Sequence, residues 1–100
     1  MVVLEVAQFE IKPGMEQEFE EGARKAVPLF RRAKGCTSMK LLRSVENPAH
    51  YRLFVRWATL EHHTVDFRES NDFQEWRKLV GHCFAAAPNV EHVHEAMDGF

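Results

Sequence analysis

Two hydrophobic periods divide the chain into strands and helices. Residues 2–11 (VVLEVAQFEI) alternate so that both faces of an extended strand are largely apolar, which predicts a strand covered on both sides. Pro13 and Gly14 then mark a turn. The two faces of the strand carry Val2, Leu4 and Val6 on one side and Val3, Ala7, Phe9 and Ile11 on the other.

Residues 15–33 change to apolar steps of three and four, which predicts an amphipathic helix. Glutamates gather at its start and basic residues at its end, as the helix dipole favours. Glu20 stands four residues before Arg24, so we expect these two side chains to form an ion pair on the helix surface.

The second half of the chain predicts three more strands and a divided helix. Residues 36–46 and 50–58 form a hairpin around Asn47–Pro48, two helices follow, and residues 89–97 form a last short strand. This order, β-α-β-β-α-β with the second helix split, is the ferredoxin-like α+β arrangement, a four-stranded antiparallel sheet with helices on one face. The other sheet face is also apolar, so we expect a homodimer whose sheets pack together as a dimeric α+β barrel.

Composition narrows the class of protein. The 100 residues suit a single domain, 1–100, and a net charge of −2 argues against nucleic acid or an anionic membrane as partner. The first residues, MVVLEVAQFE, lack a basic region before an apolar run, so we expect no secretory signal or membrane span and a cytoplasmic location. Cys36 and Cys83 form no CxxC motif and are expected to be free thiols.

The adjacent histidines His62 and His63 separate on the predicted helix that follows the capping residue Thr59. At 100° per residue, His63 lies within about 60° of the inward-facing Leu60, whereas His62 lies on the opposite side. We therefore predict that His63 faces the protein interior and that His62 faces water.

His63 has two interpretations. It is either a partly buried histidine bonded to a backbone carbonyl, or a general base beside an aromatic pocket that burial and a helix N-terminus keep neutral. The surrounding rings can equally be core or pocket walls, and Arg68 can lie in water or meet an anionic ligand. These rings belong to Trp57, Phe67, Phe73 and Trp76.

Metal and cofactor motifs are weak in this sequence. His92 and His94 share one face of the last predicted strand, a spacing that can hold a metal, but no third ligand is placed beside them, so we predict no metal site. The chain has no glycine-rich phosphate loop, GxSxG, HExxH or Rossmann fingerprint, so we expect no cofactor.

Residues 57–80, WATLEHHTVDFRESNDFQEWRKLV, resemble the W-x-(S/T)-x-E-x-H segment of the antibiotic biosynthesis monooxygenase (ABM) domain family. The resemblance runs from the first strand through residues 11–36 to residues 87–97 and so covers nearly the whole chain. It implies a dimeric α+β barrel. Some relatives are cofactor-independent oxygenases and others degrade haem, but the haem-degrading branch uses a first-strand asparagine that residues 2–11 lack.

The resemblance therefore implies a cofactor-independent monooxygenase that acts on a small aromatic substrate of phenolic, quinol or polyketide-like type. In that hypothesis His63 is the base and Arg68 stabilises an anion. The walls of the pocket are Trp57, Phe67, Phe73 and Trp76. The alternative is a non-catalytic dimeric barrel that binds a small molecule or is associated with stress.

Overall fold

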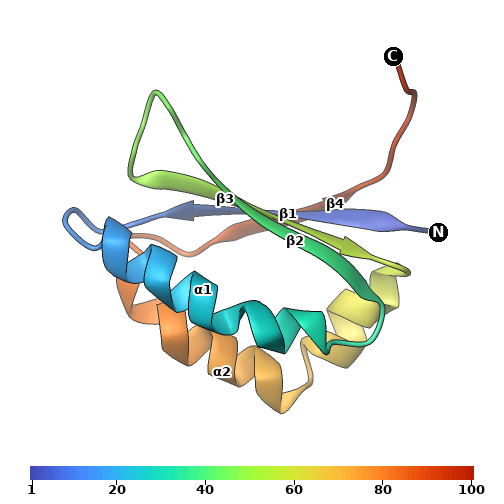
Figure 1. Cartoon of the computed structure of the whole chain (residues 1–100), viewed down its shortest axis with the longest axis horizontal. Coiled ribbons are helices and arrows are strands. Elements are labelled where there is room, and N and C mark those ends of the chain that lie inside the picture. Colours follow the sequence, from blue (N-terminus) through green and yellow to red (C-terminus); the bar gives the residue numbers. More distant parts are fainter.

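A computed structural model of the chain, which describes residues 1–100, places four antiparallel strands in one sheet and the helices on one face of it (Figure 1). The strands follow the order β2-β3-β1-β4, so β2 and β4 are the two edges. The predicted ferredoxin-like α+β fold is thus confirmed. In chain order the elements are β1 (Val3–Glu10), α1 (Glu16–Arg31), β2 (Cys36–Arg43), β3 (His50–Trp57), η1 (His62–Phe67), α2 (Asn71–Val80), η2 (Gly81–Cys83) and β4 (Asn89–Val93).

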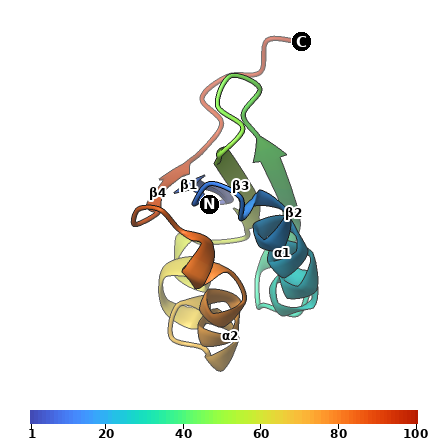
Figure 2. The same cartoon turned by 90° about the vertical axis from the view of Figure 1, so that its left-hand side faces the viewer.

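The two long helices lie under opposite halves of the sheet. Figure 2 shows α1 below β2 and α2 below β4. The helices also contact each other, and Gly22 makes this approach possible because a Cβ there would stand 2.6 Å from the backbone oxygen of Leu79. None of these helices combines the length and the apolarity needed to cross a membrane.

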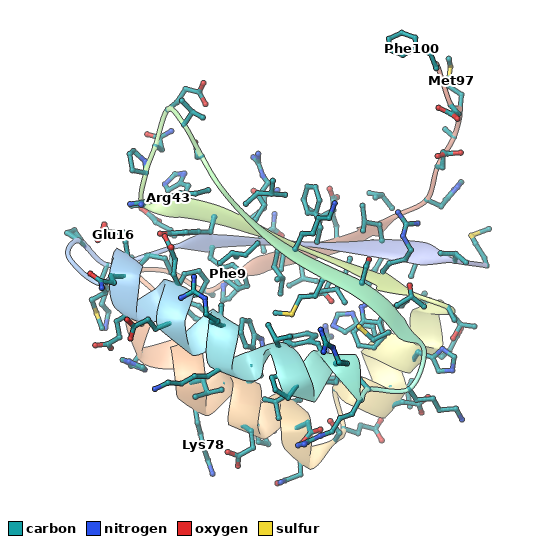
Figure 3. All side chains as sticks on the ribbon, viewed as in Figure 1. Phe9, Glu16, Arg43, Lys78, Met97 and Phe100 are labelled. Carbon is teal, nitrogen blue, oxygen red and sulfur yellow. The ribbon has the colours of Figure 1, made fainter.

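Every second residue of β1 faces the helices. Val3, Ala7 and Phe9 are buried on that face as predicted, and Figure 3 shows Phe9 between the sheet and the helices. Glu5 stands between Val3 and Ala7 on the same face and is only 5% exposed. The sheet therefore carries one carboxyl group into an otherwise apolar layer.

The segment after β3 coils more widely than the predicted α-helix. Thr59 accepts a hydrogen bond from the His62 backbone N–H (3.3 Å), so its predicted capping role is confirmed. From His62 onward the segment is a π-helix, and the Arg68 N–H donates to the His63 carbonyl five residues earlier (3.1 Å). His63 nevertheless points inward as predicted, since it is 3% exposed.

Helix α2 begins at Asn71 and is capped by Ser70, whose Oγ accepts the Phe73 N–H (3.2 Å). Two strands end earlier than the sequence predicts. The hairpin strand β2 ends at Arg43, before the predicted residue 46, because the chain turns there. The last strand ends at Val93, four residues earlier than predicted, because its pairing with β1 stops at the Leu4–Val93 pair.

The prediction that His62 faces water is also wrong. Its Nδ1 is buried without a hydrogen-bond partner, and the ring packs against Gly35 so closely that a Cβ at Gly35 would lie 2.1 Å from Nδ1. Gly35 also has a positive φ of 80°. Gly14 has a similar φ of 86°, but a Cβ added there would have no atom within 4 Å. A substitution at Gly14 therefore meets backbone strain alone, whereas one at Gly35 meets both strain and crowding.

We expect Gly14→Ala to lower the free energy of unfolding by about 1 kcal/mol, the cost of left-handed backbone for a residue with a Cβ. Gly35→Ala should lower it clearly further, because the His62 ring must also move. Urea denaturation measures both losses. In a His62→Ala background the cost of Gly35→Ala should fall to that of Gly14→Ala, and equal costs for the two single variants would contradict the role of His62.

Candidate functional site

His63 lies in a sandwich of aromatic rings beneath the sheet. Its imidazole stacks on Trp57, the last residue of β3, with ring centroids 5.1 Å apart and an interplanar angle of 19°. Phe67, one π-turn along η1, lies beside both rings. This packing fixes the plane of the imidazole and thereby the direction of its two nitrogens.

Each nitrogen of His63 has a partner from a different strand. Nε2 lies 3.3 Å from Glu5 Oε1 of β1, and Nδ1 lies 2.7 Å from His92 Nε2 of β4. The sheet register explains the meeting, since Glu5 and His92 are opposite each other in the β1–β4 ladder and share a face. The three side chains form a continuous line, the Glu5–His63–His92 chain.

Glu5 has a second hydrogen bond that holds its carboxyl group in place. The indole Nε1–H of Trp57 donates to Glu5 Oε1 over 3.0 Å. Trp57 is fully buried, so this bond lies inside the protein. Trp57 thus stacks on His63 and also orients the acid to which His63 is bonded.

Burial sets the proton affinities along this chain. It raises the pKa of Glu5 to about 7, although the Trp57 hydrogen bond and the positive charge of Arg68 oppose the rise. Burial lowers the pKa of His63 to about 4, with further lowering by His92 and Arg68. The pKa of His92 is lowered by burial and then by Arg68. At neutral pH both imidazoles are therefore uncharged, while Glu5 is close to its midpoint.

Two proton arrangements satisfy every hydrogen bond in this chain. With Glu5 ionised, His63 Nε2–H donates to Glu5 and His92 Nε2–H donates to His63 Nδ1. With Glu5 protonated, each bond reverses its direction, so Glu5 donates to His63 and His63 donates to His92. The arrangements differ by one proton, which enters or leaves at His92 Nδ1. That atom has no protein partner and is solvent-accessible, since His62 Nδ1 is the one buried side-chain polar atom without a partner.

The aromatic residues named from the sequence are mostly core. Trp57, Phe67 and Trp76 are 0%, 4% and 7% exposed, and Phe67 and Trp76 both pack on Phe30 at centroid distances of 4.9 and 5.2 Å. Phe73 is half-buried at the edge of this cluster, 5.8 Å from Phe67. The rings therefore position His63 more than they surround a ligand.

Arg68 lies exposed at the end of η1, close enough for its charge to act on Glu5, His63 and His92 together. Two cavities of about 670 and 760 Å³ open on the molecule, one between α1 and β2 and one near the β2–β3 turn. Neither is lined by His63 or by the rings around it. The Glu5–His63–His92 chain thus ends at the β4 edge, outside both of these cavities.

Sequence reasoning missed Glu5 and gave His92 a different role. The signal for Glu5 was a single carboxylate on the alternating face between Val3 and Ala7. His92 was paired with His94 as a possible metal site, but His94 lies beyond β4, is exposed, and bonds only to the adjacent Glu95 carbonyl. The partner of His92 is therefore His63, which no spacing within β4 could reveal.

A separate group of possible metal ligands lies at the start of α1. Glu18, His82 and Cys83 bring one ligand atom each to within 4.8 Å of one another. Burial and the Glu18 carboxylate raise the pKa of the Cys83 thiol, which disfavours the thiolate that binds a metal. A Glu18–His82 hydrogen bond beside a buried thiol accounts for this group.

Proteins of similar sequence and structure share this fold. A family model described as Antibiotic biosynthesis monooxygenase matches residues 2–79. The chain is 40% identical over 94 residues to the uncharacterized protein YczJ of Bacillus subtilis, covering 94% of this chain and 99% of that protein. A solved structure from Bordetella bronchiseptica, named for the same family, is 50% identical with a TM-score of 0.94 and covers 96% of this chain and 98% of its own.

A more distant structure carries a more specific name. SnoaB, a cofactor-independent oxygenase from Streptomyces nogalater, has a TM-score of 0.80 with 16% identity over 97% of this chain and 95% of its own. At that identity the similarity shows the fold.

Proposed function

Because the chain belongs to the antibiotic biosynthesis monooxygenase family, we propose that it is a monooxygenase that works without a cofactor on a small aromatic substrate bearing an acidic proton, such as a quinol, phenol or anthrone. The Glu5–His63–His92 chain carries this proposal, because it offers a neutral base at the surface and a buried group to receive the proton. The proposal is supported by SnoaB, which has the same fold and is named a cofactor-independent oxygenase.

In this proposal the substrate proton enters the chain at His92. His92 Nδ1 accepts it, the Nε2 proton of His92 passes to His63 Nδ1, and the Nε2 proton of His63 passes to Glu5 Oε1. Each imidazole changes tautomer and neither stays charged, so no cation is left in the buried layer. The substrate is left as an electron-rich anion beside Arg68.

The anion then reduces dioxygen. For an anthrone, the carbanion bonds to O₂ and reduces it to a peroxide anion, which takes back the proton held by the chain. The hydroperoxide loses the second C–H proton and its terminal oxygen as water, and a ketone remains. The balance is CH₂ + O₂ → C=O + H₂O, with both electron pairs supplied by the substrate.

The residues named from the sequence take divided roles in this proposal. His63 transfers the proton and does not touch the substrate, since both of its nitrogens are engaged. Trp57, Phe67 and Trp76 are positioning residues because they are buried against it or against its neighbours. Of the named residues, Arg68 and Phe73 are accessible enough to contact a substrate at the β4 edge.

We further propose that the chain acts as a homodimer. The sheet face opposite the helices carries apolar residues that no element of the same chain covers, and packing two such faces together would bury them. Light scattering should give the mass of two chains. The apolar residues include Leu4 and Val6 of β1, Leu42 of β2, Phe54 of β3 and Val93 of β4.

An oxygen electrode tests the proposed activity. Anthrone, a naphthoquinol and a catechol are each added to the protein, and at least one should consume O₂ well above its rate of autoxidation. The rate should be unchanged after treatment of the protein with a chelator. Oxygen uptake equal to autoxidation for every compound would contradict the oxygenase proposal.

A non-catalytic binding module is the second candidate. It is favoured by the close packing of the rings around His63 and by the position of the 670 Å³ cavity elsewhere in the molecule. A binding module would show a rise in melting temperature with a small aromatic compound and no oxygen uptake.

A further inference from the structure

The cavity of about 670 Å³ lies between α1 and the edge strand β2, on the side of the sheet away from β4. Its volume falls in the range of about 300–1,000 Å³ that is typical of sites for small molecules. Its apolar lining includes Val27 of α1 and Met39 and Leu41 of β2. Three arginines also line it, against a single carboxylate, Glu20.

At one end of this cavity the charged side chains, Glu20 and Arg43, already have partners within the protein. Glu20 accepts a hydrogen bond from the Tyr51 hydroxyl (2.6 Å), so it does not form the ion pair with Arg24 that the sequence predicts. Arg43 lies 3.6 Å from Glu20 and over the Tyr51 ring, and it donates to the Pro48 carbonyl (2.6 Å). Figure 3 shows Arg43 near the end of α1 that is marked by Glu16.

The other two arginines have no such partners. Arg24 and Arg31 take part in none of the salt bridges of the chain. They are seven residues apart on α1, two turns along the same face, and both line the cavity. The hydroxyls of Thr37 and Ser38 line it near this end, because only residues 32–35 separate the end of α1 from the start of β2.

We propose that this cavity binds a small molecule with an apolar body and one anionic group, held by Arg24 and Arg31 with the body against Val27, Met39 and Leu41. Guanidinium groups match the geometry of carboxylates and phosphates, and two unpaired ones beside an apolar wall select an amphiphilic anion. The whole chain has a net charge of −2, so this cationic end is a local feature. The proposal is independent of the oxygenase proposal, because the cavity and His92 lie at opposite edges of the sheet.

Calorimetric titration with four naphthalene compounds tests this site. 2-Naphthoate and 2-naphthyl phosphate share an apolar body with neutral 2-naphthol and with cationic 2-naphthylmethylammonium. We expect at least one of the two anions to bind at least tenfold more tightly than naphthol, and the cation to bind least. The stronger anion identifies the group that the site prefers, and its affinity should fall with added salt because part of the attraction is electrostatic.

Matched variants locate the binding. Arg24→Ala with Arg31→Ala should reduce the affinity for the preferred anion at least tenfold, to the level of naphthol. Lys25→Ala with Lys34→Ala removes the same charge from exposed positions outside the cavity and should leave the affinity within about twofold. Equal binding of all four compounds, or equal losses in the two double variants, would overturn the proposal. Because all four side chains are exposed, each variant should fold.

Discussion

Replacement of His92 by glutamine should slow the turnover of an anthrone or quinol substrate by about 10²- to 10⁴-fold, the usual contribution of a general base. A glutamine amide can still hydrogen-bond to His63 Nδ1, but it cannot accept and pass on a proton. Substrate binding should change little, so the loss should appear in kcat rather than KM. Initial rates in the oxygen electrode measure both constants.

His94→Gln is the matched control for this prediction. His94 lies two residues further on, outside β4, and hydrogen-bonds only to the Glu95 carbonyl, so its variant should keep the wild-type rate. Full activity in His92→Gln would remove the Glu5–His63–His92 chain from the mechanism and would leave the oxygenase proposal standing. The proposed proton transfer through this chain and the proposed oxygenase activity can therefore fail separately.

The rate should also depend on the ionisation of Glu5. The chain can accept a proton only while Glu5 is ionised, and the pKa of Glu5 is about 7. Turnover at saturating substrate should therefore rise with pH through about 7 and then level off. In Glu5→Gln this rise should be absent and the rate low throughout, because the proton has no final acceptor.

Glu5→Gln should also stabilise the protein at pH 8, by about 3 kcal/mol, and have little effect at pH 4. Burial raises the pKa of Glu5 from 4.5 to about 7, and each pKa unit corresponds to about 1.36 kcal/mol of stability. Glutamine keeps the shape and can accept the Trp57 N–H and donate to His63 Nε2. Urea denaturation of both proteins at the two pH values measures the difference.

The sign follows from proton binding. The folded protein binds the Glu5 proton more tightly than the unfolded chain does, so the contribution of Glu5 to stability falls as pH rises from about 4.5 to about 7. His63 acts in the opposite direction, because its pKa is lowered from 6.5 to about 4 and its contribution is lost as pH falls through that interval. Comparing variant and wild type at the same pH isolates the Glu5 contribution.

Glu10→Gln provides the control on the same strand. Glu10 is exposed at the end of β1, so its replacement should change stability by no more than about 0.5 kcal/mol at either pH. An equal effect of Glu5→Gln at pH 4 and pH 8 would contradict a raised pKa for Glu5. A stabilised and inactive Glu5→Gln would show that the buried acid is kept for chemistry at a cost in stability.

The fold was predictable because its signals are local. Alternation in β1 and β3, the three-to-four-residue steps of α1, and the turns at Pro13–Gly14 and Asn47–Pro48 predict the order of elements from neighbouring residues alone. The ends of β2 and β4 were not predictable in this way. A strand ends where its pairing with a neighbouring strand stops or where the chain turns, and both depend on other segments.

The inward direction of His63 was predicted correctly, and His63 shares the buried side of η1 with Phe67. The expectation that Leu60 also faces inward was wrong, since Leu60 is 39% exposed. The burial of His62 Nδ1 was not predictable, since His62 packs against Gly35, which belongs to the loop before β2. The aromatic series around His63 was correctly identified as a cluster. Its packing as core, rather than as the wall of a cavity, depends on how the helices sit beneath the sheet.

The sequence by itself determined the strands and helices, the buried face of each and the inward histidine, because side-chain periodicity and turn chemistry act over a few residues. Only the tertiary structure decided what His63 touches. His63 and His92 are 29 residues apart, and Glu5 is further still, so their hydrogen bonds require the β1–β4 register and the position of η1 to be set together. Hydrogen bonding depends on tenths of an ångström and on direction, which no spacing along a chain can specify.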